Sequence, residues 1–217
     1  TEQLKILAKS MEIKKEIHSE SPDHEKAQIR QRKKIERSRL TSEQCRICSR
    51  IICETIEKES WYQKTENLLL YVSVNNEVSL EWLMEKAWKD GKKVFLPRVH
   101  RTNMEFYQVN GKAELEMGSF HIMEPVKSCP AYKPVPEAVM VVPGVAFSIF
   151  GERIGYGKGY YDRYLNHYPG KIYLIGASYE MQLENDRWKS DRFDRKMDIV
   201  ITEKRKVECN GESGRIV

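Results

Sequence analysis

Apolar residues in the first quarter of the chain recur every three or four positions, the spacing of one face of a helix. In residues 1–20 this spacing predicts a first helix, with an apolar side made of Leu4, Leu7, Met11 and Ile17. The sequence Ser21-Pro22-Asp23 then ends that helix and starts another, which we expect to run from Pro22 to Ser38.

A third helix is predicted to open at Thr41. Gln44 follows three residues later, and this spacing is typical of a capping box, in which both side chains bind backbone N–H groups. The same segment carries the apolar residues Ile47, Ile51 and Ile52. The first quarter of the chain is therefore predicted to be helical throughout.

Short apolar runs replace the helical spacing from Asn67 onward. LLLYVSV and KVFLP each predict a buried strand. The segment SLEWLMEKAWKDG between them predicts a helix that is capped by Ser79 and closed by Gly91. A strand, a helix and a second strand in this order predict a right-handed parallel crossover.

The second half of the chain predicts a mixed sheet. MEFYQV precedes Asn110-Gly111, a pair typical of tight hairpin turns, so we expect an antiparallel strand there. AVMVV (138–142) and KIYLIGA (171–177) predict buried strands with the helix YYDRYLNHY between them, and DIVIT (198–202) predicts the last strand. From its residues alone, the chain is expected to form one α/β domain followed by a frayed tail at 209–217.

The composition fits a folded domain with a strongly charged surface. The chain has 217 residues, of which 40% are hydrophobic and 32% charged, with a mean hydropathy of −0.63, and this length suits one substantial domain. No apolar run approaches the roughly 18 residues of a membrane span, and the start of the chain lacks the pattern of a secretory signal. We therefore exclude membrane-spanning and secreted proteins.

Five cysteines, an odd number in a chain without an export signal, indicate free thiols in a reducing compartment. We expect a cytoplasmic protein. Cys45 and Cys48 form a CxxC pair, but no second pair of cysteines or histidines follows at ligand spacing. We therefore interpret them as small apolar residues on a helix.

The net charge of +5 arises from one segment. Residues 25–39 contain seven Lys or Arg and two Asp or Glu, which equals the whole excess. Their spacing predicts a basic stripe along the second helix, made of Lys26, Arg30, Lys33 or Lys34, and Arg37. Nucleic acid, a membrane surface and the phosphates of a nucleotide are candidate partners for this stripe, and a solvated helix face is the simpler alternative.

A glycine-rich segment lies between the strand AVMVV and the helix that starts near Tyr160. Gly155, Gly157 and Gly159 alternate there and surround Lys158. Glycines let backbone N–H groups approach an oxyanion, and the following helix adds the positive end of its dipole. The spacing fits neither the P-loop nor the dinucleotide fingerprint. Phosphate binding with Lys158 and Arg153 is the functional hypothesis, and a tight turn without a ligand is the alternative.

This segment resembles a known family. PGVAF followed by G-x-R-x-G-x-G-K-G-Y-Y-D-R-Y-L is similar to the signature of the 5-formyltetrahydrofolate cyclo-ligases, also called methenyltetrahydrofolate synthetases. The resemblance extends through GKKVFLPR, IGASYEMQ and FDRKMDIVITE and covers roughly residues 24–203. It implies a three-layer α/β/α fold with a mixed, mostly parallel sheet, related to sugar-phosphate isomerases and coenzyme A transferases. It also divides the chain into a helical extension (1–23), one α/β domain (24–208) and a flexible tail (209–217).

The resemblance also implies the site residues. Those for the ATP phosphates are Lys26, Arg30, Arg153, Ile154, Gly155, Tyr156, Gly157, Lys158, Gly159, Tyr160 and Tyr161. Magnesium would be bound by Asp162 and Asp194. The folate site would include Val72, Glu77, Phe120 and Tyr160, and the catalytic residues would be Lys158, Arg153 and Tyr160.

The implied reaction is the ATP-dependent closure of 5-formyltetrahydrofolate to 5,10-methenyltetrahydrofolate, with release of ADP and phosphate. The implied protein is a cytoplasmic monomer that binds neither nucleic acid nor membrane. Two other functions are weighed against this one. The first is a catalytically silent relative that binds nucleotide or RNA, and the second is a different ATP-using enzyme on the same fold.

Overall fold

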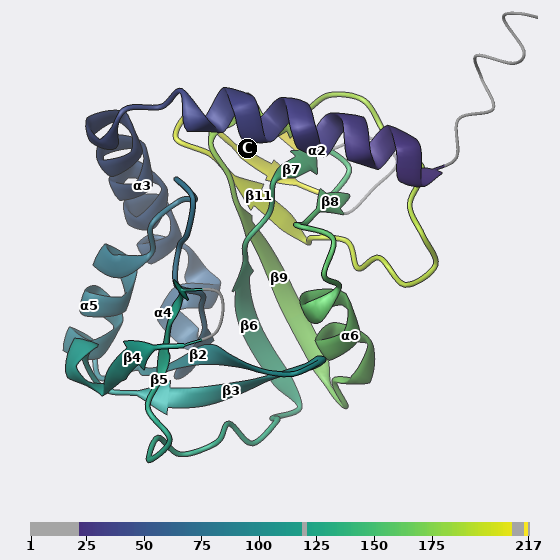
Figure 1. Cartoon of the computed structure of the whole chain (residues 1–217). Helices are drawn as coiled ribbons and strands as arrows, with labels where there is room; N and C mark the ends of the chain where they lie inside the picture. Colours follow the sequence, from purple (N-terminus) through teal and green to yellow (C-terminus); the bar gives the residue numbers. More distant parts are fainter. Residues whose placement is uncertain (1–21, 119–120, 210–214, 217) are drawn as a thin grey trace, which may run out of the picture.

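A mixed eight-stranded sheet forms the centre of the molecule (Figure 1). The computed structural model describes residues 22–118, 121–209 and 215–216. The sheet has the strand order β13-β12-β11-β9-β6-β1-β2-β3. Its five inner strands pair in parallel: β11 (Ile199–Ile201), β9 (Lys171–Ala177), β6 (Glu137–Val142), β1 (Asn67–Leu69) and β2 (Lys93–His100). Antiparallel strands extend both edges, namely β3 (Asn103–Val109), β12 (Lys206–Glu208) and β13 (Arg215–Ile216).

Helices cover both faces of this sheet, which confirms the predicted three-layer fold. Leu68 and Leu70 point to the face covered by α3 (Ser42–Glu57), α4 (Ser60–Lys64) and α5 (Glu81–Lys89), whereas Leu69 points to the opposite face. That second face is covered by α6 (Tyr160–His167), through its buried Leu165. The inner strands are apolar in almost every position because successive side chains are buried on opposite sides.

The helices of the first quarter largely match the prediction. Helix α2 (Pro22–Ser38) has the expected bounds and lies across one end of the sheet (Figure 1). Helix α3 begins after Thr41 with the predicted capping box. Its buried face, however, is made of Ser49, Ile52, Cys53 and Ile56, while Ile47 and Ile51 are exposed. The predicted helix in residues 1–20 lies outside the described residues.

The parallel crossover from β1 to β2 is confirmed, but two of its details differ from the prediction. Strand β1 ends at Leu69, although the chain stays buried through Tyr71. Ser79 is not the N-cap residue of α5: Leu80 occupies that position, and the Ser79 hydroxyl accepts a longer bond of 3.4 Å from the N–H of Glu81. Gly91 follows the helix with φ +74°, as expected of a closing glycine.

The antiparallel strand was predicted correctly, but its turn was not. Strand β3 pairs with β2 through Arg101-Thr102, where Arg101 adopts a left-handed conformation. Asn110-Gly111 instead leads into the 3-10 turn η1 (Lys112–Glu114) and β4 (Leu115–Met117), which pairs with β5 (Met123–Pro125). A turn signal in the sequence does not show whether the strand beside it pairs with the preceding or with the following strand.

A small second sheet was not predicted. It consists of β7 (Ala146–Ser148), β8 (Arg153–Ile154) and β10 (Leu183–Glu184), which follows the 3-10 turn η3 (Glu180–Gln182). Its strands β7 and β8 lie between β6 and α6 in the chain, and β8 leads directly into residues 155–159, called the glycine loop below. Strands of two or three residues are too short to show a period in the sequence.

The C-terminal part of the sheet also exceeds the prediction. DIVIT forms β11, but it is not the last strand, because β12 and β13 continue the sheet. The expected frayed tail is therefore wrong for residues 215–216, and residues 210–214 lie outside the described part. Among the described residues, no helix combines the length and the apolar character that crossing a membrane requires.

Candidate active site

One large cavity, of about 1440 Å³, collects most of the predicted site residues. It lies near the carboxyl ends of β1, β2 and β6, since its walls include Tyr71–Asn75, Glu77, Val99 and Pro143. Helix α2, the glycine loop and α6 complete the walls. Ligands of α/β proteins collect at the carboxyl ends of parallel strands, so this is the expected place for a substrate.

The glycine loop adopts a conformation that its sequence makes easy. Gly157 and Gly159 have φ values of +88° and +68°, a region that other residues rarely adopt. Gly159 directly precedes α6 and is its N-cap residue. From α2, the Arg30 Nε donates to the Gly155 carbonyl oxygen at 2.8 Å. The loop therefore presents backbone N–H groups at a helix start, next to a cation from α2.

Two cations of this region differ in how they are held. Lys158 is exposed and forms no hydrogen bond or ion pair within the described residues. Arg153 is 8% exposed, and its Nη2 donates to Asp162 at 2.7 Å. Its Nε is buried and has no hydrogen-bond partner among the described residues. Arg153 is thus fixed in the cavity wall by Asp162, whereas the Lys158 side chain is exposed.

The two carboxylates predicted to bind magnesium line the same cavity. Asp162 is ion-paired with Arg153, and Asp194 with Lys26 of α2. Within the described part of the chain, Asp162 Oδ2 and Asp194 Oδ1 accept no hydrogen bond, so each residue keeps an oxygen for a cation. No group of three or more acidic, histidine or cysteine side chains in that part could hold a metal. Two carboxylates plus phosphate oxygens are nevertheless a common magnesium environment.

Glu77 lines the cavity beside Tyr156 of the glycine loop and is 6% exposed. Its Oε2 accepts a hydrogen bond from the Val74 N–H at 3.0 Å, which closes the turn after β1. Burial raises the pKa of Glu77 to about 7, although the Val74 bond, the charge of Arg37 and a bond with Tyr156 oppose this rise. Because α5 begins at Glu81, Glu77 does not serve as part of its first turn.

Other predicted folate residues are partly placed. Val72 and Tyr160 both line the cavity, and the Tyr160 hydroxyl donates to the Arg101 carbonyl oxygen at 3.0 Å. Phe120 lies outside the described residues. Its neighbour His121 is in the cavity wall and adopts a left-handed conformation, with φ +58°.

Two predicted phosphate residues also have a packing role. Ile154 lines the cavity but is buried in a small core cluster with Ala146 and Trp188. Tyr161 packs against the core of the second face, and the Arg153 guanidinium lies 5.8 Å from its ring centre. Burial raises the pKa of Tyr161 well above its usual value, so this phenol stays protonated at neutral pH.

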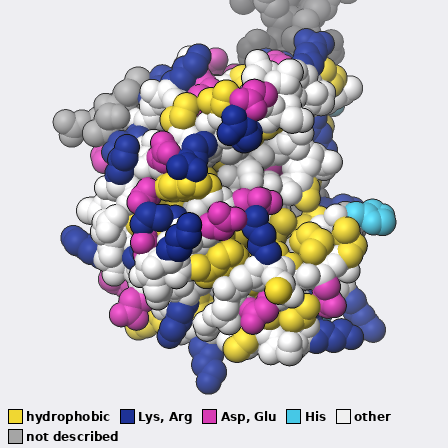
Figure 2. All heavy atoms as spheres, turned by 90° about the vertical axis from the view of Figure 1, so that its left-hand side faces the viewer, with side chains coloured by type: hydrophobic (Ala, Val, Ile, Leu, Met, Phe, Trp, Pro, Cys, Tyr) yellow, Lys and Arg dark blue, Asp and Glu magenta, His cyan; other side chains and the backbone are white. Residues whose placement is uncertain are grey.

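The basic stripe of α2 faces the cavity and the protein interior. Lys26 and Arg30 line the cavity, whereas Lys33 and Arg37 are buried. Lys33 pairs with Glu184 and donates to the Met181 carbonyl oxygen. On the molecular face that carries α3 and α5, basic and acidic side chains are interspersed (Figure 2). This distribution gives no support to nucleic acid or a membrane as the partner of the stripe.

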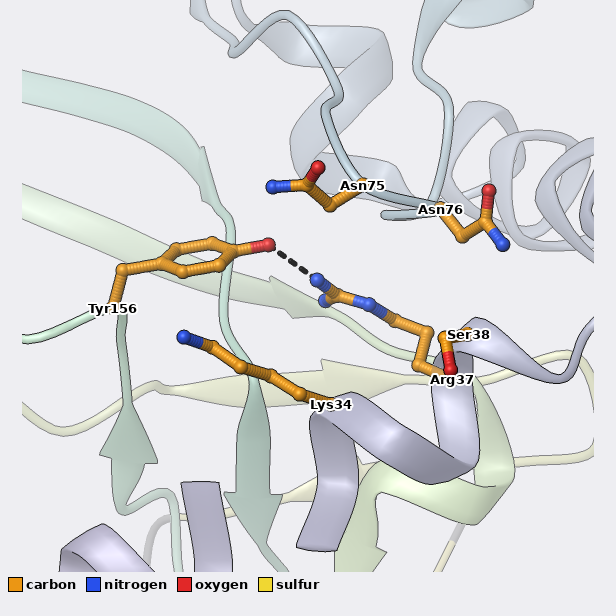
Figure 3. A pocket seen from close by; sticks show the side chains of 6 residues that line it. All are labelled: Lys34, Arg37, Ser38, Asn75, Asn76 and Tyr156. Carbon is orange, nitrogen blue, oxygen red and sulfur yellow. Dashed lines mark hydrogen bonds between the residues drawn. The ribbon is translucent and has the colours of Figure 1, made fainter. Parts of the chain in front are cut away.

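Arg37 is the residue that the sequence analysis did not place at the site. It lies in the last turn of α2 and donates to the Tyr156 hydroxyl (Figure 3). Beside it is a side pocket of about 350 Å³, lined by Lys34, Arg37, Ser38, Asn75, Asn76 and Tyr156. Tyr156 and Asn75 line the large cavity as well, so the two hollows adjoin. The available signal was the seven-residue spacing from Arg30, which puts both residues on one helix face.

Comparison with known proteins agrees with this geometry. The sequence profile of the 5-formyltetrahydrofolate cyclo-ligase family matches residues 22–203. A probable 5-formyltetrahydrofolate cyclo-ligase of Schizosaccharomyces pombe is 31% identical over 168 residues, which cover 70% of this chain and 81% of the relative. The 5-formyltetrahydrofolate cyclo-ligase of Escherichia coli K12 is 30% identical over 138 residues, covering 61% of this chain and 75% of the relative.

A solved structure shares the fold as well. The NMR structure of Aquifex aeolicus 5,10-methenyltetrahydrofolate synthetase superposes with a TM-score of 0.75 at 32% identity, and the match covers 86% of this chain and 93% of that one. The profile match includes α2, the glycine loop, Asp162 and Asp194, and so spans the whole site described above. We conclude that the chain belongs to the 5-formyltetrahydrofolate cyclo-ligase family, a family of ligases.

Proposed function

We propose that this protein uses ATP and magnesium to convert 5-formyltetrahydrofolate to 5,10-methenyltetrahydrofolate, with ADP and phosphate as the other products. The observation that carries the proposal is that one cavity combines two unlike groups. The first is the glycine loop with Lys158, which has no ion pair among the described residues, and the neighbouring Arg153. The second is the buried carboxyl of Glu77. The first suits phosphates, and the second suits the N–H donors of a pterin ring.

The chemistry explains why such a site needs no protein nucleophile. The formyl oxygen is a poor leaving group until it receives the terminal phosphoryl group of ATP. Nitrogen 10 of the folate then attacks the formyl carbon and loses its proton, and the C–O bond breaks so that the oxygen leaves as part of phosphate, which can take up this proton. The protein has to align the two substrates and neutralise charge on the transferring group.

The cations around the glycine loop can meet this need. Lys158 is the exposed cation within the loop, and we assign it to the transferring phosphoryl group. Arg153, fixed by Asp162, adds positive charge beside the loop, while Lys26 and Arg30 supply positive charge from α2. Preorganised cations of this kind stabilise the charge that develops during transfer. Tyr160 lines the same cavity, and we assign it to both the phosphates and the folate.

Magnesium would be held by Asp162 and Asp194 together with phosphate oxygens. When bound, it would neutralise phosphate charge and orient the phosphate chain. We expect Asp162→Asn and Asp194→Asn each to raise the magnesium concentration for half-maximal rate about tenfold or more, since each removes a charged ligand. Titration of activity with magnesium at saturating ATP measures this midpoint.

A nearby carboxylate provides the control for the magnesium titration. Asp191 lines the same cavity, and its Oδ1 accepts from the Phe193 N–H. Asp191→Asn should leave the magnesium midpoint within about twofold of the wild type, because this residue is not assigned to the metal. Unchanged midpoints in both the Asp162 and Asp194 variants would contradict the shared magnesium site.

The assay that tests the proposed function follows methenyltetrahydrofolate by its absorbance. Purified protein is mixed with 5-formyltetrahydrofolate and magnesium, with and without ATP, and ADP release is measured in the same samples. We expect product formation that requires ATP and equals ADP release. ATP-independent product formation, or none under any condition, would reject the proposed function.

We also propose that the protein is a monomer in the cytoplasm. Size-exclusion chromatography with light scattering can check that it is a monomer.

A further inference from the structure

Arg37 is a buried cation. It is 2% exposed and forms no ion pair within the described residues, although its charge opposes the rise in the pKa of Glu77. Its Nη1 donates to the Gly144 carbonyl oxygen at 3.2 Å, and its Nη2 donates to the Tyr156 hydroxyl. Burying a guanidinium costs free energy unless its donors are satisfied, so these two bonds need an explanation beyond the folding of α2.

Both partners of Arg37 belong to segments that shape the large cavity. Gly144 directly follows Pro143, which lines the cavity at the end of β6. Tyr156 is the second residue of the glycine loop. Figure 3 shows the Arg37 guanidinium directed at the Tyr156 hydroxyl, with Asn75 drawn above this bond. Arg37 thus joins the end of β6 to the loop that we assign to phosphates.

Arg30 makes the same kind of contact two turns earlier on the same face of α2. It binds the Gly155 carbonyl oxygen, whereas Arg37 binds the Tyr156 side chain. Two successive loop residues are therefore held by one rigid helix. A loop with glycines at 155, 157 and 159 loses much conformational freedom when it orders, so such anchors lower the cost of ordering it for a ligand.

We propose that Arg37 is a positioning residue that holds the glycine loop, through the Tyr156 hydroxyl, in the conformation that receives the nucleotide phosphates. The effect extends to the folate wall, because Tyr156 lines both the large cavity and the side pocket beside Asn75. This inference deepens the proposed function and rests on it for the kinetic part of the test. Its binding part uses ADP with magnesium and does not require turnover.

The first experiment compares Arg37→Met with the wild type by calorimetric titration with ADP and magnesium. Loss of a charge-assisted hydrogen bond should weaken ADP binding about tenfold or more. In steady-state assays KM for ATP should rise by a similar factor, while kcat falls less, because Arg37 is not assigned to the transferring group. Arg37→Lys should recover part of the lost affinity, since an ammonium can still donate to Tyr156.

A second pair of variants separates positioning from stability. Lys33→Met removes another buried cation from α2, but its partners are Glu36, Met181 and Glu184, none of which belongs to the glycine loop. We expect this variant to lose thermal stability and to bind ADP within about twofold of the wild type. Tyr156→Phe removes just the hydroxyl, which bonds with Arg37 and also with Glu77. Combined with Arg37→Met, it should weaken ADP binding by less than the sum of the two single effects, because the two changes share the Arg37–Tyr156 contact.

The outcomes separate the two claims. Wild-type ADP binding by Arg37→Met would overturn the inference, as would an equal loss in Lys33→Met or fully additive losses in the Arg37 and Tyr156 pair. If the wild type binds ADP but makes no methenyltetrahydrofolate, the proposed function fails while the binding comparison still tests Arg37. If the wild type does make this product and Arg37→Met keeps its KM for ATP, Arg37 alone is misassigned.

Discussion

Lys158→Ala is expected to lower kcat by a factor of about 10² to 10³, the usual effect of removing a preorganised charge from a transferring group. Folding should be unaffected, because Lys158 is exposed and bonds to no described part of the protein. The measurement is turnover at saturating substrates, accompanied by a thermal melt. The kcat of Lys158→Arg should lie between those of the wild type and Lys158→Ala, since arginine keeps the charge but has a different geometry.

Lys133→Ala provides the matched control for this experiment. Lys133 is also an exposed lysine, and it does not line the cavity. It should retain wild-type kcat and KM. Unchanged turnover in Lys158→Ala, or an equal loss in Lys133→Ala, would refute the assignment of Lys158 to phosphoryl transfer.

Glu77→Gln is expected to weaken folate binding. A glutamine keeps the size of the side chain but places one donor against the N–H groups of the pterin, and such a buried mismatch costs about 1 to 3 kcal/mol. This corresponds to a loss of roughly 5-fold to 150-fold in kcat/KM for 5-formyltetrahydrofolate. ADP affinity measured without folate should stay near the wild-type value.

The same substitution should make the protein more stable at alkaline pH. The folded-state pKa of about 7 lies above the usual 4.5, so the folded protein holds the proton more tightly than the unfolded chain. The free energy of unfolding contributed by Glu77 therefore falls as pH rises from 4.5 to 7 and stays low above pH 7. Relative to the wild type, Glu77→Gln should gain up to about 3 kcal/mol at pH 8 and nothing near pH 4.

The pH dependence of activity follows from the same group. If the carboxylate recognises the pterin, wild-type kcat/KM for folate should fall as pH drops through about 7. Glu81→Gln is the matched control, because Glu81 lies in the first turn of α5 and outside the cavity. A Glu77→Gln variant with wild-type folate kinetics would reject its assignment to the folate site, whatever its stability.

The elements that the sequence predicted well are those with local signals. Thr41 and Gln44 formed their capping box because both partners lie within one turn. The inner strands were recognisable because burial on two faces makes them continuously apolar. The strands β7, β8 and β10 were missed, because their pairing depends on contacts between distant segments.

The same difference between local signals and contacts of distant segments applies to the site. The alternating glycines and Lys158 are adjacent in the chain, so the phosphate hypothesis could be formed from the sequence. The family resemblance assigned Glu77 to folate and Asp194 to magnesium, and both residues line the cavity. The role of Arg37 was not visible. Its partners Gly144 and Tyr156 are more than 100 residues away, and a basic stripe does not reveal which side chains turn inward.

Helix α2 precedes every other described element, yet its contacts with the site lie far along the chain. Lys26 meets Asp194 across 168 residues, and Arg37 meets Gly144 across 107. During synthesis, α2 is therefore expected to dock after its distant partners have been made. Contacts between segments far apart in the chain form late in folding. A nascent or partly denatured protein could thus have an intact sheet core and still be inactive. Hydrogen exchange should show α2 opening at lower free energy than β6 and β9.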